Sequence, residues 1–436
     1  MALEGIDLSI IALEHPAGWI DSPADDRLAA PAGLPPTGAS VRTAPSSASA
    51  RALDWFTLFL SDVQTGFGPF VAIYLTAHQW AQLDIGLVLT VGALVALVAQ
   101  MPGGALVDAV RSTKLVAGVA VAGICASALG LALWPSFAIV MAARVMHAAA
   151  SCVLGSAIVA ISLGLVGHAA LGERLGRNAR FASIGNASAA ALMGACGYLV
   201  SNQAVFFLTA ALVAPALLAL RCIRTRDIVP SSRRSCGFSL RTVVSDRRLL
   251  VFAACILLFQ LANAAMLPLM GGMLAGCCGA WAASFIGACT VVPQLVVVAI
   301  APLVGRAADS WGRRPLLLLC FAALAVRGAL FAVIREPGIV IAVQALDGIS
   351  AAVLGILVPL VVADVVGGSG RFNLALGTVG TAVGIGAAMS TTLAGYAMDH
   401  VGGQFTFALL ASVAACGLGL VWLMLPETRP EPIVPR

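Results

Sequence analysis

The sequence predicts an all-α membrane protein that crosses the bilayer many times, and three observations lead to that prediction. Of its 436 residues, 60% are apolar and only 10% are charged, against about 25% charged residues in an average soluble domain. The apolar residues form long segments rather than ten-residue stretches of alternating polarity, which disfavours an outer-membrane barrel. The arginines gather between alternate apolar segments. This composition excludes a soluble enzyme.

The first segment, residues 1–50, is expected to be a disordered tail. It is rich in Pro, Ala, Ser and Gly, carries six acidic residues and has no apolar run of twenty residues, a composition that favours disorder. The basic start, apolar centre and cleavage site of a signal peptide are also missing. A dispensable tail, a start codon assigned too far upstream and a regulatory segment all remain open.

From Leu53 onward the chain is divided into apolar stretches. Each needs about twenty residues to cross roughly 30 Å of hydrocarbon. Twelve spans are expected, at residues 53–77, 83–107, 113–134, 136–160, 182–201, 203–224, 249–273, 281–304, 315–334, 338–363, 374–398 and 403–425.

The placement of basic residues predicts the orientation, because cytoplasmic loops are enriched in Arg and Lys. With both termini inside, the inner loops and the C-terminal tail hold nineteen Arg and Lys residues, and the outer loops hold one, Arg335. The expected organisation after the tail is a bundle at 51–224, a basic linker at 225–248, a second bundle at 249–425 and a short tail at 426–436.

The two halves repeat each other with a shift of about 200 residues. The segment from Gly104 to Asp108 corresponds to Gly305 to Asp309, and Arg144 in the fourth span corresponds to Gln344 in the tenth. Two six-helix halves joined by a charged loop are typical of a transporter that binds its substrate between pseudo-symmetric bundles.

One loop carries a recognisable motif. The stretch Gly305-Arg-Ala-Ala-Asp309-Ser-Trp-Gly312-Arg313-Arg314 resembles the Gly-x-x-x-Asp-Arg-x-Gly-Arg-Arg signature of the major facilitator superfamily, with Ser310 in place of its first Arg. Arg144-Val-Met-His147-Ala148 similarly resembles the family's Arg-x-x-Gln-Gly motif. The resemblance covers residues 51–425. It implies the family fold of twelve transmembrane helices in two pseudo-symmetric bundles, alternating access and a monomer.

The motif aspartates are expected at the cytoplasmic ends of spans two and eight. A carboxylate there can accept hydrogen bonds from the N-terminus of a neighbouring helix and pair with arginine. The resemblance implies that this network latches the two halves in an outward-open state; the alternative is an ordinary interfacial charge that marks topology. The expected latch residues are Gly104, Asp108, Gly305, Asp309, Gly312, Arg313 and Arg314.

Ionisable side chains at membrane depth are functional candidates, because they cost several kcal/mol unless they are paired or hydrated. Asp62 in the first span and Arg144 and His147 in the fourth are expected to form a proton-sensitive cluster. A static ion pair between two helices is the alternative. Arg327 and Asp347 are expected to pair, in a structural role or in coupling and substrate binding. Gln64 and Asn263 add uncharged polar groups at mid-depth.

Other motifs support packing or topology. The glycines of spans five and eleven favour close helix contact: Gly185, Gly194, Gly197, Gly377, Gly380, Gly384, Gly386 and Gly395. The segment from Gly172 to Arg180 is expected to be a charged inner loop. Eleven scattered cysteines and five single histidines indicate neither disulfides nor a metal site. No cofactor is expected, and no Walker loop for ATP occurs.

The sequence therefore predicts a secondary transporter, not an enzyme, that moves a small organic solute across a bacterial inner membrane. Proton coupling and efflux are favoured, because the drug:proton antiporter-like branch shares the chain's length, span count, acid in span one and Arg in span four. Proton-coupled uptake of a metabolite is the runner-up, and a transporter-like sensor is a third possibility. The expected partners are the solute, protons and the lipid bilayer, without nucleic acid.

Overall fold

The computed structural model describes residues 46–65, 67, 69–229, 246–278, 282–366 and 371–428, and these form helices joined by short turns. The chain divides into Met1–Thr43 and Ala44–Arg436, and every described residue belongs to the second unit. Most of the expected tail and of the basic linker lies outside the described residues, so neither expectation is tested.

The described residues of the first half form seven helices and a short 3-10 turn, η1. They are α1 (Ser47–Thr65), α2 (Pro69–Ala77), α3 (Gln82–Ala109), α4 (Thr113–Leu133), α5 (Phe137–Val166), α6 (Leu171–Leu199), α7 (Ala204–Cys222) and η1 (Thr225–Asp227).

The second half follows the same order. Its helices are α9 (Arg247–Asn263), α10 (Met266–Cys278), α11 (Ala282–Ser310), α12 (Arg313–Val333), α13 (Pro337–Val343), α14 (Ala345–Val366), α15 (Phe372–Val401) and α16 (Gly403–Met424).

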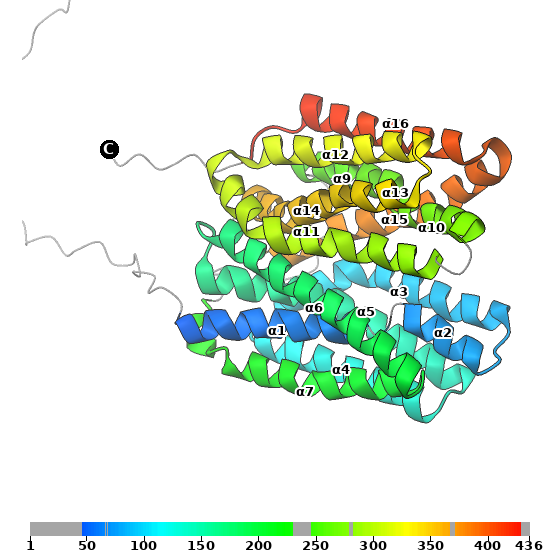
Figure 1. Ribbon diagram of the computed structural model, residues 1–436. Helices are drawn as coiled ribbons and strands as arrows, with labels where there is room; N and C mark the ends of the chain where they lie inside the picture. The colour runs from blue at the N-terminus through cyan, green and yellow to red at the C-terminus, as the bar shows by residue number, and fades with distance from the viewer. Residues whose placement is uncertain are drawn as a thin grey trace, which may run out of the picture. The chain divides into compact units, whose positions relative to one another are not determined.

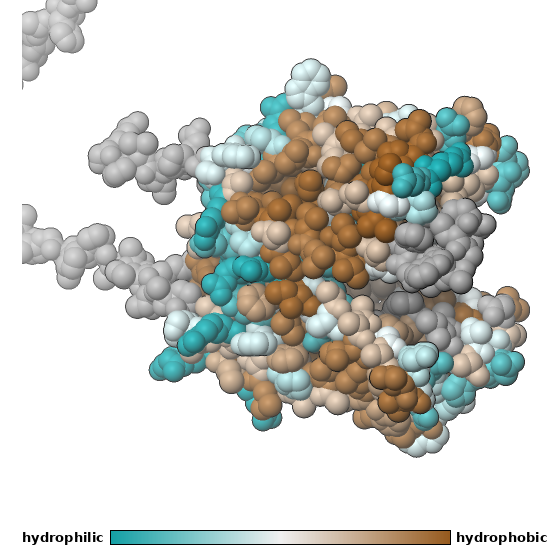
Figure 2. Space-filling model, viewed as in Figure 1, coloured by the Kyte–Doolittle hydropathy of each residue, from teal (hydrophilic) through white to brown (hydrophobic). Residues whose placement is uncertain are grey.

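Ten segments of the described chain are helical, long and apolar enough to cross a membrane. They correspond to ten of the twelve expected spans. The other two correspond to the pair α1–α2, where the helix is interrupted between Thr65 and Pro69, and to α6, whose first turns are charged. Figure 2 shows the apolar side chains over the middle of one face of the bundle, with hydrophilic residues mainly towards its two ends. The fold is thus all-α and polytopic, as predicted.

The segment from Gly172 to Arg180 is not a loop, as the sequence led us to expect, but the start of helix α6. Two of its three arginines, Arg174 and Arg177, have a partner on α1. The side chain of Arg174 forms a buried ion pair with Asp54, and Arg177 reaches the other carboxylate oxygen at 2.5 Å. Arg174 also donates to Asn178 one turn further along the helix, at 2.9 Å.

Helix α1 begins at Ser47, inside the stretch that we expected to be tail. The hydroxyl groups of Ser46 and Ser49 donate hydrogen bonds to Asp227, at 2.6 and 2.7 Å. These bonds lower the pKa of the Asp227 carboxyl below its ordinary value. The start of α1 is therefore tied to the turn that follows α7.

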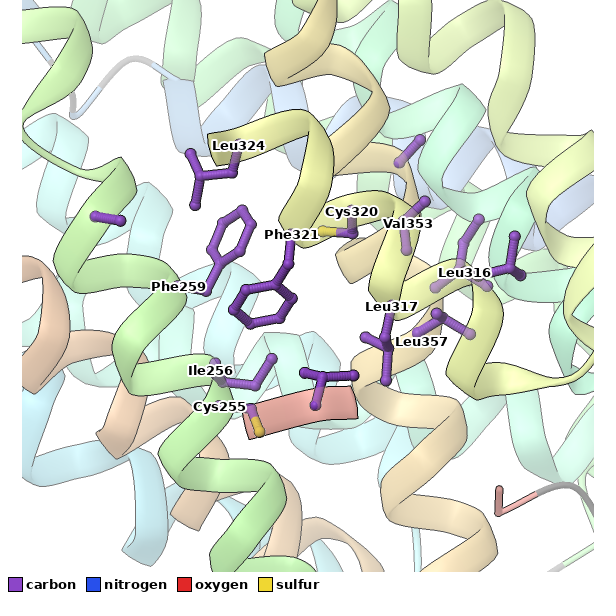
Figure 3. Packing of buried hydrophobic residues seen from close by; sticks show 14 of the residues in the cluster. Cys255, Ile256, Phe259, Leu316, Leu317, Cys320, Phe321, Leu324, Val353 and Leu357 are labelled. Carbon is purple, nitrogen blue, oxygen red and sulfur yellow. The ribbon is translucent and has the colours of Figure 1, made fainter. Parts of the chain in front are cut away.

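Among the described residues, two large clusters of buried apolar side chains form most of the core, one in each half, and a third, small cluster contains Ala189, Met193 and Val205. The first contains residues between Ala52 and Ile223. The second extends from Leu249 to Leu425 and also takes in Leu171 and Leu175 of α6. Figure 3 shows part of the second cluster, where the rings of Phe259 and Phe321 meet edge to face at 5.4 Å between centroids. Aromatic pairs of this kind hold neighbouring helices together by close packing.

The two halves meet through α3 against α15 and α6 against α11; Figure 1 shows α6 lying beside α11. The backbones of the two halves touch directly at these contacts, because glycines, which have no Cβ, lie at the interface. A Cβ at Gly104 would collide with the carbonyl of Asn373, and one at Gly305 would collide with the carbonyl of Gly172. Small residues thus allow the halves to approach closely.

The contacts at Gly104 and Gly305 lie near one end of the bundle, which we call the basic end. It carries the turns α3–α4, α5–α6 and α11–α12 with their basic residues. Figure 1 shows the starts of α1 and α12 and the end of α16 at this end, on the left.

Candidate transport site

A cavity of about 540 Å³ lies between the halves, lined by α3 and α5 from the first and by α14 and α15 from the second. Among the described residues that line it, the polar ones all come from the first half. They are Gln100, Arg144, His147, Ser151, Cys152 and Ser156. The second half contributes apolar side chains and two glycines: Leu354, Gly355, Val358, Pro359, Leu376, Gly380 and Val383.

Arg144 is held at the cavity wall by one hydrogen bond. Its Nη1 donates to the backbone carbonyl of Phe67, between α1 and α2, at 3.0 Å. Its Nε is buried and has no hydrogen-bond partner. The guanidinium lies against Gly92 of α3, where a Cβ would come within 2.9 Å of Nη2. Gly92 therefore makes the space that the Arg144 side chain occupies.

His147 lies one turn further along α5 and is held by the same phenylalanine. Its ring stacks on the ring of Phe67, with 3.9 Å between centroids and 14° between planes. Ser151 Oγ lies 3.4 Å from His147 Nε2. Phe67 thus orders both Arg144 and His147.

The expected cluster of Asp62, His147 and Arg144 does not form in this conformation. Asp62 is buried and accepts a hydrogen bond from Ser188 of α6, at 3.0 Å. Arg144 instead takes the carbonyl of Phe67, which is free because α1 ends at Thr65. The expectation rests only on how deep each residue lies in the membrane, and depth does not determine the direction in which a side chain points.

The expected pair of Arg327 and Asp347 is present, between α12 and α14. Nη1 of Arg327 donates to the Asp347 carboxylate and, at 2.7 Å, to Oδ1 of Asn263 on α9. The guanidinium also lies 5.4 Å from the centre of the Phe331 ring. Three helices of the second half are joined by this group. Gln64, by contrast, contributes its backbone carbonyl to Phe67 N–H.

Asp108 bridges the two halves at the basic end. It accepts from the backbone N–H groups of Asn373 and Leu374, at 3.2 and 2.9 Å, and from the Asn373 side chain at 2.6 Å. Both N–H groups lie in the first turn of α15, where backbone donors have no partner within the helix. The partial positive charge of a helix N-terminus also favours a carboxylate.

Asp309 occupies the equivalent place in the second half. Its carboxylate oxygens lie 3.0 Å from the position of a Cβ on Gly172, in the first turn of α6. Its Oδ1 also lies 3.5 Å from Nη1 of Arg313. Each half therefore places a carboxylate at the start of a helix that belongs to the other half.

The remaining latch candidates hold the second half together. Gly312 has a φ of +99° and immediately precedes α12 as its N-cap residue. Arg313 pairs with Asp364 at the end of α14, at 2.8 Å. The backbone N–H groups of Arg313 and Arg314 donate to Glu427, at 2.8 and 3.0 Å, and Arg314 also reaches the carbonyl of Trp422. All of these partners lie in the same half.

Several residues of these sites were not singled out from the sequence. Gln100, Ser151 and Ser156 line the cavity, and Asp54, Asp364 and Glu427 fix the helix ends. One signal was available for the cavity: Ser151 follows His147 by four residues, so both lie on one face of a helix. Among the described residues no cluster of three His, Cys, Asp or Glu side chains could hold a metal.

Comparisons with known proteins agree with this geometry. The sequence model of the Major Facilitator Superfamily matches residues 55–277 and 253–436. Two uncharacterized MFS-type transporters of Mycobacterium tuberculosis, from strains CDC 1551 and H37Rv, are each 37% identical over 390 residues, covering 87% of this chain and 93% of their own.

Solved transporters share the fold. The crystal structure of the human organic anion transporter MFSD10 (TETRAN) matches with a TM-score of 0.68 at 16% identity, covering 86% of this chain and 100% of its own. A mutant of the nucleoside transporter NupG matches with a TM-score of 0.62 at 15% identity, covering 87% and 100%. At these identities the likeness concerns the fold alone.

Proposed function

Because the chain belongs to the major facilitator superfamily, we propose that it is a proton-coupled transporter that exports a small organic solute by alternating access. The observation that supports this most directly is the cavity of about 540 Å³ between the halves. Its volume falls within the roughly 300–1,000 Å³ of small-molecule pockets. The solute binds there, and rocking of one half against the other exposes it to either side.

The contacts at the basic end support alternating access. Asp108 and Asp309 each lie at a helix start of the other half, and glycines bring the backbones together beside them. These groups form the latch in our proposal. Both carboxylates must leave the helix starts before this end can open. The latch therefore disfavours the inward-facing state relative to the outward-facing one.

Asp62 is the proposed proton carrier. It is 3% exposed, lies in the first span and accepts one hydrogen bond, from Ser188. A carboxylate in such a position is costly to keep charged within a bilayer. Protonation on one side and release on the other would therefore drive the conformational cycle.

The direction and the location complete the proposal. Export is supported by the resemblance to drug-exporting members in length, in span count, and in the positions of Asp62 and Arg144. The excess of basic residues at one end supports a bacterial inner-membrane protein with that end and both termini in the cytoplasm. The fold works as a monomer in this proposal, and nucleic acid has no part in it. Proton-coupled uptake of a metabolite is the alternative that uses the same residues.

A proton-flux assay tests the proposal. The purified protein is placed in liposomes with an imposed pH gradient and a lumenal pH dye, and lipophilic cations, organic acids, sugars and amino acids are added in turn. We expect proton movement that depends on one class of solute and disappears in Asp62→Asn. Asp84→Asn is the matched control, since Asp84 lies in the first turn of α3, away from the cavity.

The sign of the flux separates the two directions. Protons that move against the solute indicate export, and protons that move with it indicate uptake. Normal flux in Asp62→Asn would remove Asp62 from the mechanism. No flux with any solute, from protein shown to be folded, would contradict proton coupling and leave facilitated diffusion or the sensor.

A further inference from the structure

The wall of the central cavity is chemically divided. The six polar side chains come from α3 and α5, whereas α14 and α15 contribute aliphatic side chains, proline and glycine. A solute that fits such a cavity has a polar end and an apolar body. Sugars, which are polar on all sides, would leave hydroxyl groups without hydrogen-bond partners against Leu354, Val358 and Val383, which is unfavourable.

The charge of the wall is also one-sided. Arg144 is permanently cationic, and no described residue that lines the cavity carries a carboxylate. The two aspartates that the sequence places at membrane depth, Asp62 and Asp347, do not line the cavity and interact with Ser188 and Arg327 respectively. A cation at membrane depth that lacks a counter-charge is unfavourable, and a bound anion would supply the missing charge.

The hydrogen-bonding capacity of Arg144 is likewise incomplete. Its Nη1 is used by the Phe67 carbonyl, but its buried Nε has no partner. His147 follows Arg144 by three residues and Ser151 follows His147 by four, so all three side chains lie on one face of α5. Arginine presents its donors in a fork that fits a carboxylate.

We propose that the cavity binds an amphipathic organic anion, whose acidic head group pairs with Arg144 and whose apolar body lies against α14 and α15. This deepens the proposed function by naming the substrate class, and it rests on the cavity being the transport site. The His147–Ser151 pair adds one donor beside the head group, since their mutual hydrogen bond at 3.4 Å uses the other. The proposal disfavours lipophilic cations, which would meet Arg144 without an acceptor.

A matched set of probes tests the charge preference directly. We use 4-phenylbutyrate, 4-phenylbutanamide and 4-phenylbutylamine, which share one apolar body and carry a negative, a neutral and a positive head group at pH 7.4. Binding is measured at equilibrium to the protein in phosphatidylcholine nanodiscs, with empty nanodiscs as the background for partition into lipid. We expect the carboxylate to bind at least tenfold more tightly than the amide, and the amine to bind most weakly.

Variants of Arg144 and its neighbour then locate the preference. Arg144→Gln is expected to lower carboxylate affinity at least tenfold and to leave amide affinity within about threefold, while Arg144→Lys retains part of the preference. Gly92→Ala places a methyl group where the guanidinium lies and is expected to weaken the carboxylate selectively. Gly86→Ala is its control, because no heavy atom lies within 4 Å of a Cβ at that position of the same helix.

The outcomes separate this inference from the proposed function, because binding is measured without a proton gradient. Equal affinity for the three probes, preference for the amine, absence of saturable binding, or full carboxylate affinity in a folded Arg144→Gln would each overturn the anion site. Carboxylate binding that depends on Arg144, together with absent proton flux, would support the site and contradict proton coupling. If Arg144→Gln does not fold, the comparison of Gly92→Ala with Gly86→Ala decides.

Discussion

The backbone carbonyl of Phe67 accepts a hydrogen bond from Nη1 of Arg144 at 3.0 Å. The ring of the same residue stacks on His147, with 3.9 Å between centroids. Phe67 lies between α1 and α2, outside both helices, which is why its carbonyl is free to accept from a side chain. One residue in a helix break therefore positions both the cation and the imidazole at the cavity wall.

The first prediction concerns this residue. Phe67→Leu keeps the carbonyl bond to Arg144 but removes the ring that stacks on His147, and aromatic pairs of this kind contribute about 0.5–1.5 kcal/mol beyond burial. We expect a loss of about 1–2 kcal/mol in unfolding free energy, measured by thermal unfolding in detergent. Phe137→Leu is the control, since Phe137 stacks on Trp80 at 5.9 Å but is 45% exposed. Equal losses in the two variants would contradict this role.

The second prediction concerns the latch. Asp108→Ala removes the acceptor for two backbone N–H groups at the start of α15, an interaction with a helix terminus that contributes about 0.3–1 kcal/mol, and up to about 2 when partly buried. We expect the basic end to open more often. Double electron–electron resonance between bioorthogonal spin labels at positions 111 and 311 should show a larger long-distance population.

Asp84→Ala provides the matched control for the latch, because Asp84 lies on α3 as well, but in its first turn. Its distance distribution should equal that of the parent protein. An unchanged distribution in Asp108→Ala would remove the bridging role of this carboxylate.

The third prediction concerns the approach of α6 to α11. A Cβ at Gly176 would lie 2.6 Å from the carbonyl oxygen of Ala301 and 3.2 Å from Cα of Pro302. At Gly194, on the same helix, a Cβ would have no heavy atom of a packing neighbour within 4 Å. Gly176→Val is expected to cost about 1–3 kcal/mol through overpacking, and Gly194→Val to change stability by less than about 0.5 kcal/mol. The stabilities of the two variants are compared by thermal unfolding. An unchanged stability in Gly176→Val would show that α6 and α11 can move apart at little cost.

The fourth prediction concerns the buried pair in the second half. Asp347→Leu leaves Arg327 uncompensated and is expected to cost about 3–5 kcal/mol, whereas Arg327→Met with Asp347→Leu should recover most of the loss, because well-packed apolar residues replace buried pairs at little cost. Thermal unfolding gives both values. Proton flux in the double variant then decides the role of the pair: retained flux indicates a structural brace, and lost flux indicates coupling.

The fifth prediction concerns pH. Hydrogen bonds from Ser46 and Ser49 lower the pKa of Asp227 below its ordinary value of 3.8, so they stabilise the fold when the carboxylate is charged. Their contribution is present above about pH 4 and is lost as the pH falls through the lowered pKa.

The double variant Ser46→Ala/Ser49→Ala should therefore melt at a lower temperature than the parent at pH 7, with a gap that narrows towards pH 3. Part of the gap remains, because both hydroxyls also accept backbone N–H bonds that do not depend on pH, from Ser49 and Arg224. Ser412→Ala, which loses a bond to the carbonyl of Ala408 at an exposed site, should leave the melting temperature unchanged. A gap that is constant with pH would contradict the role of the Asp227 carboxylate.

Much of the architecture follows from the sequence because it depends on one-dimensional patterns. Apolar length predicted the helices, and the repeat of Gly104 to Asp108 at Gly305 to Asp309 predicted that both aspartates lie at helix ends. The pairing of Arg327 with Asp347 also followed, since their depths were similar and no other charge lay within those two spans. These predictions needed only distance along a helix.

The rest depended on the direction in which side chains point, which advances by about 100° per residue and is sensitive to helix breaks. Asp62 and Arg144 have compatible depths but different partners, Ser188 and Phe67. Likewise, Gly194 and Gly395 were expected in close contacts, yet nothing lies within 4 Å of a Cβ at either position. Short breaks, such as those at Phe67 and Gln344, leave too little trace in the composition to be predicted.

The two bridging carboxylates are related by the internal repeat of the chain. Asp309 follows Asp108 by 201 residues, and the start of α15, at Phe372, follows that of α6, at Leu171, by the same 201 residues. A patch on one half meets its counterpart on the other in the way that identical subunits meet in an isologous twofold dimer. A six-helix half on its own would carry this self-complementary surface. Two copies of one half would then form the same paired contacts that the two halves form within the single chain.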